Sequence, residues 1–297
     1  MTLENTLPTA ANRGGADIAV RLDERDGLPA RLWRSTRFVL PVLAGLVVFT
    51  VVLWALFPWY FAPQSPTQTF PASRLLPPGA EHWFGTDYVG RDLYTRVVHG
   101  TRVSIGGASL AVFIGFLIGC LIGIPSGYVG GRTDEVCMRV IDVLLAIPSL
   151  LLALMVVTVL GPGTGNAAIA VGVSLIGTFA RLSRTEVLRC RSEAYIEAAY
   201  LAGSSRFYTL VFHVLPNVSG TLIALGVLEF GLALLSLAAL SFLGYGAAAP
   251  TPEWGNLVAE GRNYIAIAGW LTILPGAVIA LLVVSLNYLS RRIAGRH

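Results

Sequence analysis

Residues 197–216 read E-A-A-Y-L-A-G-S-S-R-F-Y-T-L-V-F-H-V-L-P and lie between two strongly apolar stretches. Residues 192–202 are rich in helix-forming Glu, Ala and Leu, and Gly203 suits the left-handed position that ends a helix. Either of the two serines that follow can cap a second helix, and the Pro-Asn pair at 216–217 is expected to end it. The stretch therefore predicts a helix, a turn and a helix on a membrane surface.

One face of the first predicted helix carries small residues beside a carboxylate. Ile196, Ala199, Tyr200 and Gly203 share a stripe at helical spacing, and Glu197 lies next to it. Such a stripe favours the docking of another protein. Taken alone, E-A-A-x-x-x-G is equally well a good helix with a glycine cap, so the rest of the chain must decide between the two interpretations.

The composition indicates an integral membrane protein. Of the 297 residues 55% are hydrophobic and 13% are charged, and the mean hydropathy of +0.69 exceeds what a soluble core of this length needs. All 21 basic residues are Arg. Because a P-loop needs Lys to hold the β- and γ-phosphates, ATP that drives this protein must bind to another subunit.

Six apolar spans are expected, which predicts an all-α fold. They are residues 38–57, 103–129, 135–160, 167–180, 218–243 and 264–289. Pro148 is predicted to kink the third span, and the fourth is short enough to depend on its neighbours. The second span carries glycines every four residues, at Gly115, Gly119, Gly123 and Gly127, so we expect a close approach by another helix.

These spans divide the chain into five parts. We expect a cytoplasmic N-terminal segment (1–37), a first transmembrane helix (38–58), an extracytoplasmic segment (59–102), a five-helix core (103–290) and a cytoplasmic tail (291–297). The core contains the loop at about 183–217 with which this section began. Within the extracytoplasmic segment, residues 92–99 are predicted to form a short amphipathic helix on the membrane surface, with glycines allowing turns on either side.

The loop resembles the EAA loop of ABC importer permeases. The matching residues are Glu197, Ala198, Ala199, Gly203, Leu215 and Pro216. His213 departs from the usual Ile of this pattern, as peptide-type relatives often do. In that family the loop is the coupling helix that sits in a cleft of a separate ATPase subunit, so the resemblance implies this role for the matching residues.

A second stretch is similar to a signature of the dipeptide, oligopeptide and nickel branch of these permeases. Residues 84–105 read F-G-T-D-Y-V-G-R-D-L-Y-T-R-V-V-H-G-T-R-V-S-I. The matching residues are Gly85, Thr86, Asp87, Gly90, Arg91, Asp92, Arg96, Gly100 and Arg102. An acid–base role for Asp87 and Asp92 is weakly supported, because both have arginine neighbours. We expect them to be ion-paired structural carboxylates.

The resemblance continues in S-F-L-G-Y-G from Ser241, T-P-E-W-G-N from Thr251 and W-L-T-I-L-P-G-A from Trp270, and it covers about residues 80–290. The tail S-R-R-I-A-G-R-H departs from the G-D-G-L-R-D of many relatives. The family implies the fold of a type I ABC importer permease in a bacterial inner membrane. It also implies a second homologous permease as a heterodimer partner, two cytoplasmic ATPase subunits that bind ATP and Mg, and an extracytoplasmic substrate-binding protein.

The arginines give an independent prediction of topology. With six spans and both termini in the cytoplasm, sixteen arginines lie inside and five outside, in agreement with the positive-inside tendency. The five are Arg74, Arg91, Arg96, Arg102 and Arg262. This topology places the EAA loop in the cytoplasm, and because the arginines cluster beside apolar spans we expect lipid contact and no nucleic acid.

Two ionisable residues inside the spans are candidates for the transport pathway. Asp142 lies three residues from Arg139, and a local ion pair is a sufficient explanation for it. Glu229 is deeper and must face protein or water, because lipid would leave its charge unsatisfied. We expect no catalytic constellation, cofactor or metal site in this chain, since the cysteines and histidines have no ligand-type spacing.

Three alternatives remain open. An ion-gradient-driven transporter would use Glu229 and Asp142 as a proton relay, usually with two repeated halves that this sequence does not display convincingly. A membrane scaffold or sensor would dock a cytoplasmic protein without transport. Within the permease family, the cargo can be dipeptides, longer peptides, nickel chelates or other small ligands, because selectivity rests mainly with the binding protein.

Overall fold

The computed structural model describes residues 29–294, and the side chains of residues 39–292. By its contacts the chain divides into residues 1–43 and 44–297, and the arrangement given below is that of the second unit. The regular structure of the described residues is helical, apart from one isolated β-bridge between Thr86 and Asp92. Most of the expected N-terminal segment, residues 1–28, and the last three residues of the expected tail lie outside the description.

Within residues 29–294, five helical stretches are long and apolar enough to cross a membrane. They are α2 (Pro29–Leu56), α4 (Leu93–Val129), α7 (Thr164–Arg191), the continuous run α9 (Arg206–Thr209), η3 (Leu210–Val214), α10 (Leu215–Leu240) and η4 (Ser241–Tyr245), and α12 (Trp270–Ala294). The pair α5 (Gly131–Ala146) and α6 (Ser149–Leu160) adds a sixth if it forms one broken span. The short helices are α3 (Pro58–Phe61), η2 (Pro71–Ser73), α8 (Ala194–Leu201) and α11 (Trp254–Arg262).

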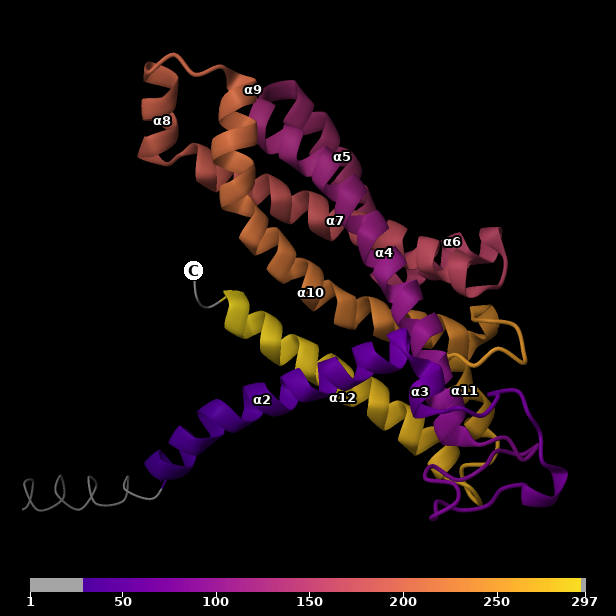
Figure 1. Ribbon diagram of the computed structural model, residues 1–297. Coiled ribbons are helices and arrows are strands. Elements are labelled where there is room, and N and C mark those ends of the chain that lie inside the picture. The colour runs from indigo at the N-terminus through magenta and orange to yellow at the C-terminus, as the bar shows by residue number, and fades with distance from the viewer. Residues whose placement is uncertain (1–28, 295–297) are drawn as a thin grey trace, which may run out of the picture. The chain divides into compact units, whose positions relative to one another are not determined.

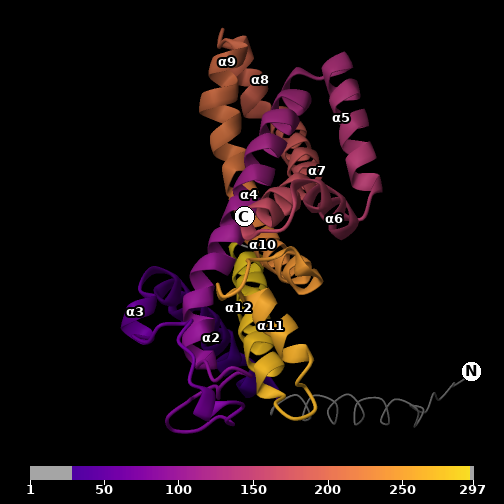
Figure 2. The same ribbon diagram turned by 90° about the vertical axis from the view of Figure 1, so that its right-hand side faces the viewer.

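The second unit has two distinct ends. In Figures 1 and 2, α8 and α9 lie beside one end of the long helix α4, whereas α11 and the loop of residues 62–92 lie at its other end. At about 1.5 Å per residue, the 37 residues of α4 extend about 55 Å, which is more than the hydrocarbon layer requires. This helix therefore links the two ends of the unit.

The predicted close approach of helices at the glycines of the second span is confirmed. These glycines of α4 face α7, and a methyl group added at Gly119 would lie 2.5 Å from Cβ of Phe179 and 2.8 Å from the carbonyl oxygen of Ile176. Gly172 of α7 contributes to the same close contact from the other helix, because a methyl group there would lie 3.0 Å from the carbonyl oxygen of Ala111. Only glycine lets the two backbones pack this closely.

Three boundaries differ from the sequence-based expectation. Pro148 does more than kink a span: α5 ends at Ala146, and α6 leaves at 90°. The fourth span is not short, since α7 continues through the arginines after residue 180 to Arg191. The predicted amphipathic surface helix at residues 92–99 is instead the first part of α4, where Leu93, Val97 and Val98 are buried.

Pro216 does not end a helix, which corrects a further expectation. The helical run passes through it from Arg206 to Tyr245. Just before it, η3 is a π-turn in which the N–H of Leu215 donates to the carbonyl oxygen of Leu210. A proline inside an α-helix normally clashes with the carbonyl group four residues earlier and cannot donate a hydrogen bond to it. The wider π-turn relieves this conflict at Pro216, so the helix continues.

Candidate functional site

The EAA turn, residues 192–205, joins α7 to α9 through the short helix α8. Gly203 has φ of +87°, as predicted, and this left-handed conformation ends α8 after Leu201. Ser205 then caps α9, because its hydroxyl accepts a hydrogen bond from the backbone N–H of Tyr208. The predicted helix, turn and helix are therefore confirmed, although the second helix continues into a span.

The inner face of α8 is fixed to the chain's own core. Ile196 is 1% exposed and packs in a cluster with Val187 of α7 and with Val214 and Val218 of the following span. The side-chain amide of Asn217 donates to the Tyr195 hydroxyl, which also contacts Sγ of Cys190 at 3.1 Å. Burial, and then the hydrogen bond with Cys190, raises the pKa of the Tyr195 phenol above its usual value.

The outer face of the EAA turn is exposed. Glu197 and Ala198 are exposed, and the Glu197 carboxylate has no hydrogen bond or ion pair with any side chain in residues 39–292. Leu201 and Phe207 are 84% and 75% exposed, although both are large and apolar. No sequence pattern marks these two residues, because their exposure depends on the register of α8 and α9.

The predicted docking stripe is wrong in part. Ile196 points into the core and Ala199 is half-buried, whereas Tyr200 and Gly203 of the same stripe are exposed. Glu197, Ala198 and Leu201, one step around the helix, are exposed as well. The last two residues of the EAA pattern, Leu215 and Pro216, begin α10, after α9 and η3.

The other end of the unit holds a buried ionic network. Arg96 is 1% exposed and binds Asp87 at 2.9 Å and Glu260 at 2.7 Å. Arg91 donates through Nε to the same Asp87 oxygen at 2.6 Å and through Nη2 to Glu260 at 3.2 Å. The four charges cancel, and they tie the loop of residues 62–92 to α4 and to α11. The expected ion-paired role of Asp87 is thereby confirmed.

The remaining signature residues have structural contacts of their own. The Thr86 hydroxyl donates to the carbonyl oxygen of Ser73 and accepts from the N–H of Leu76. Asp92 caps α4 by accepting from the N–H of Thr95, and it pairs with His82 at 2.9 Å rather than with an arginine. Arg102 is exposed on α4.

The three signature glycines differ in conformation. Gly85 and Gly90 form the predicted turns, with φ of +74° and +85°. Gly100 forms no turn but lies inside α4, where an added methyl group would lie 3.4 Å from Pro252 and Trp254. It therefore permits close packing and not a change of direction.

Two acidic residues outside the signature complete this end. Glu260 on α11 is more than 160 residues away in sequence from the arginines that it binds. Glu253, which is 2% exposed, accepts hydrogen bonds from the Ser241 hydroxyl, the Ala247 N–H and the Thr164 hydroxyl. Spacing in the sequence gives no signal for the pairing of Glu260 with the arginines or of Glu253 with Thr164, because each joins elements that only the fold brings together.

The two pathway candidates have different surroundings. Glu229 lies on α10 and is 7% exposed, so it faces protein, as expected. Asp142 on α5 is exposed and pairs with Arg181 of α7 at 2.6 Å. The expected partner Arg139 instead approaches Glu135 at 3.9 Å, so the local pair predicted for Asp142 is wrong.

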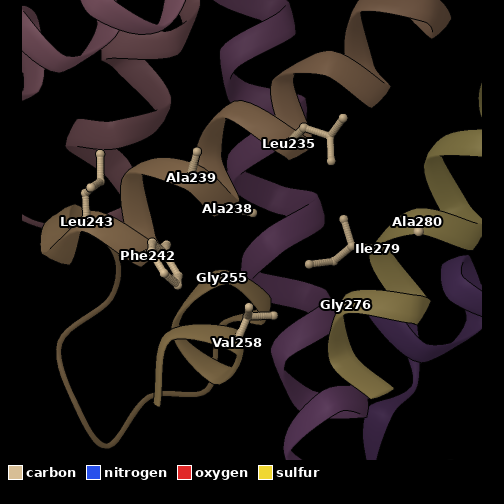
Figure 3. Close-up of a pocket in the computed structure, with 10 residues that line it drawn as sticks. All are labelled: Leu235, Ala238, Ala239, Phe242, Leu243, Gly255, Val258, Gly276, Ile279 and Ala280. Carbon is tan, nitrogen blue, oxygen red and sulfur yellow. The ribbon is translucent and has the colours of Figure 1, made fainter. Parts of the chain in front are cut away.

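An apolar groove of about 510 Å³ opens between α10, α11 and α12 (Figure 3). Its walls include Leu235, Phe242 and Ile279, with small residues at Gly255 and Gly276. The residues that line this groove are aliphatic, aromatic or glycine. It therefore offers apolar contact and no group for acid–base chemistry.

Comparison with known proteins gives consistent relatives. A family model described as a binding-protein-dependent transport system inner membrane component matches residues 106–296. The chain is 40% identical over 256 residues to a probable D,D-dipeptide transport system permease protein of Escherichia coli, with 86% of each chain covered. It is 40% identical to a dipeptide transport system permease protein of Alkalihalophilus pseudofirmus, covering 82% of this chain and 81% of the relative. A glutathione transport system permease protein of Pectobacterium atrosepticum is 36% identical over 92% of each.

Solved structures share the fold at low identity. An amino acid ABC transporter crystallised with histidines aligns with a TM-score of 0.55 and 16% identity, over 69% of this chain and 95% of that one. The MetNI methionine ABC transporter in an inward-facing conformation aligns with a TM-score of 0.54 and 16% identity, over 67% of this chain and 94% of that one. At this identity the likeness concerns the fold alone.

Proposed function

The chain belongs to the family of binding-protein-dependent transport system inner membrane components, and on this basis we propose that it is the permease subunit of an ATP-driven peptide importer. It would form half of the passage, with a second homologous permease forming the other half. The relatives are named for dipeptides, D,D-dipeptides and glutathione, which supports short peptides over nickel chelates as the cargo.

The observation that carries this proposal is the exposed outer face of the EAA turn. A carboxylate at Glu197 that has no partner among residues 39–292 and exposed apolar side chains at Leu201 and Phe207 lie on the segment that joins α7 to α9 and on the first turn of α9. A surface that combines apolar anchors with a charge suits a protein partner better than water or lipid. The ATPase subunit is that partner in our proposal, and Gly203 gives the turn its shape.

ATP and its Mg would bind to two such ATPase subunits and not to this chain, which has no Lys for a P-loop. The chain would therefore transport without catalysing hydrolysis itself. A separate binding protein would deliver the peptide to the opposite face, in line with the family's description as binding-protein-dependent.

The orientation follows from the arginines. We propose that the EAA turn and both termini lie in the cytoplasm of a bacterium, with the chain in its inner membrane. Two of the five arginines assigned to the outside, Arg91 and Arg96, are neutralised by Asp87 and Glu260. This leaves Arg74, Arg102 and Arg262 as the outer arginines that count most against the sixteen assigned to the inside.

Glu229 is proposed to adjoin the passage, because a carboxyl group buried in a span needs water, a substrate amine or a partner chain beside it. Asp142 would contribute to the pathway only through its pair with Arg181. Glu229→Gln is expected to lower peptide uptake without changing assembly of the complex. Unchanged uptake in this variant would remove Glu229 from the mechanism.

The proposed function is tested by reconstituting the chain with its partner subunits and measuring dipeptide uptake into vesicles. Uptake should need ATP and the binding protein, and a proton gradient without ATP should drive none. Uptake from a gradient alone would favour the ion-driven transporter, and binding of the ATPase without any uptake would favour a scaffold.

A variant pair tests the coupling surface in the same assay. Glu197→Ala should abolish uptake and weaken co-purification of the ATPase, while membrane insertion stays intact. Glu193→Ala is the matched control, since it removes another exposed carboxylate of the EAA turn that is not one of the matching residues of the EAA pattern. Equal effects of the two substitutions would contradict the assignment of Glu197.

A further inference from the structure

The cytoplasmic-side end of α4 in our proposed topology is held by an arrangement of side chains that we name the α4 clamp: Tyr128, Arg191, Tyr200 and Arg206. Tyr128 lies in the last turn of α4, Tyr200 on α8 and Arg206 at the start of α9. The clamp thus joins α4 directly to the EAA turn. The inference below rests on the proposed function of that turn.

The hydrogen bonds of the clamp have a fixed direction. The Tyr128 hydroxyl donates to the carbonyl oxygen of Arg206 at 2.5 Å. Its single proton is then in use, so the Tyr200 hydroxyl, 2.6 Å away, must donate to the Tyr128 oxygen. Tyr128 is therefore the centre of the chain of bonds, with one bond to α8 and one to α9.

Arg191 closes the clamp from the end of α7. Its guanidinium donates to the carbonyl oxygens of Gly127 at 3.1 Å and Tyr128 at 2.7 Å, two of the acceptors that a helix end leaves open. It also lies 5.9 Å from the centre of the Tyr128 ring. The last turn of α4 is thereby attached to both sides of the EAA turn.

The apolar cluster below α8 also reaches α4. It joins Ile196 to Cys120 of α4, and the ring of Tyr128 packs against it, but such packing has no preferred direction. The tyrosine pair is directional and lies near the other end of α8, close to Gly203. The hydrogen bond between Tyr200 and Tyr128 therefore gives α8 a directional contact with α4 beside the apolar one, and removal of a hydroxyl group tests it while the ring packing stays.

α4 is suited to carry such a movement to the opposite face. Its glycines pack backbone against backbone on α7, and Arg96 near its first turn is bound to Asp87 and to Glu260 of α11. We propose that Tyr128 is a positioning residue that transmits movement of the EAA turn to α4. Without its hydroxyl, the ATPase would still dock, but its cycle would move the passage less.

The test compares three tyrosine variants in the reconstituted importer, with peptide transported per ATP hydrolysed as the readout. Tyr128→Phe removes two hydrogen bonds and Tyr200→Phe removes one, so the ratio should fall about tenfold and about threefold respectively, on the usual scale of single hydrogen bonds. Tyr208→Phe is the control, because the hydroxyl of this exposed tyrosine has no partner in residues 39–292. All three complexes should keep their ATPase subunits.

The double variant adds a second criterion. Once Tyr128 has lost its hydroxyl, removal of the Tyr200 hydroxyl should change the transport ratio no further, because the bond between them is already gone. A wild-type ratio in Tyr128→Phe would overturn the inference while leaving the proposed function intact. Loss of the ATPase subunits in both single variants would also overturn it, by showing a role in docking. Absence of ATP-dependent uptake in the wild type would instead contradict the proposed function.

Discussion

The two ends of the helical unit use their sequence motifs in opposite ways. At one end, Asp87, Arg91 and Arg96 of the signature are buried and paired, and Glu260 completes their charge balance. At the other end, Glu197 of the EAA turn is exposed, without a partner among residues 39–292. One motif therefore holds this chain together, whereas the other leaves exposed the surface that we propose for the ATPase subunit.

Glycine makes the same contrast at nearly the same backbone angle. Gly90 has φ of +85° and Gly203 has φ of +87°. A methyl group at Gly90 would collide with the backbone of Phe70, whereas at Gly203 nothing lies within 4 Å. At Gly90 this chain requires glycine both for the backbone conformation and because a side chain has no room. At Gly203 this chain requires glycine only for the backbone conformation, and a lack of room there would come from a partner protein.

The largest effect is expected from Arg96→Ala. Removing one member of a buried ion pair leaves uncompensated charge and costs about 3–5 kcal/mol of folding free energy. The measurement is thermal unfolding of the purified chain in detergent. Arg102→Ala is the control, because this exposed arginine of the same helix has no ion pair within the described residues. Similar unfolding temperatures for the two variants would contradict the claim that the buried ionic network around Arg96 stabilises the chain.

The glycine contrast is sharpened by Gly90→Ala and Gly203→Ala. In both variants alanine must adopt the left-handed conformation, which costs about 1–2 kcal/mol of folding free energy. In Gly90→Ala the clash with Phe70 costs about 1–3 kcal/mol more. Thermal unfolding should therefore rank Gly90→Ala as the less stable variant. Equal unfolding temperatures would show that the space around Gly90 matters less than its contacts indicate.

Gly203→Asn then separates conformation from docking. Asn tolerates the left-handed region, so this variant should be nearly as stable as the wild type. If the ATPase approaches Gly203 closely, peptide uptake should still fall. Normal uptake by Gly203→Asn would mean that the residue serves only to turn the chain.

A smaller effect is expected at the interface of α4 and α7. Gly119→Ala would place a methyl group 2.5 Å from Cβ of Phe179, and overpacking of this kind costs about 1–3 kcal/mol. Gly106→Ala in the same helix meets nothing within 4 Å and should be neutral or slightly stabilising. Unfolding in detergent measures both, and equal stability would contradict the close approach of the helices.

The smallest effect is expected from Asp142→Asn. Asp142 and Arg181 are both more than half exposed, and such surface pairs contribute about 0–1 kcal/mol. Both stability and peptide uptake should stay close to the wild type. A strong loss of uptake with unchanged stability would show that Asp142 has a role in the transport pathway.

The sequence predicted most of this fold because its strongest signals are local. Apolar length predicted the spans, and a four-residue glycine period predicted a close helix contact whose partner the structure identifies as α7. Gly203 and the serines that follow it predicted the EAA turn, and the structure assigns the cap to Ser205. The resemblance to peptide-type permeases of ABC importers and the type I fold that it implies are confirmed by the family match and by the solved structures.

The errors arose where local signals met the tertiary fold. Pro216 is a strong helix breaker in sequence, but the π-turn before it keeps the helix intact. Asp142 had Arg139 nearby in sequence, yet its partner Arg181 comes from a helix 39 residues away. Glu260 and the α4 clamp depend on register and on contacts between distant elements, which no spacing rule reports.

The central claim is that the EAA turn faces the cytoplasm and is covered by an ATPase subunit. The most direct test is thiol labelling of Leu201→Cys in a chain without Cys120, Cys137 and Cys190, with Trp83→Cys at the opposite end as its counterpart. Both side chains are well exposed, at 84% and 65%. The account predicts that Leu201→Cys reacts only from the cytoplasmic side and is protected when the ATPase subunits assemble, while Trp83→Cys reacts only from outside. Labelling of Leu201→Cys from outside, or at an unchanged rate in the assembled complex, would contradict it.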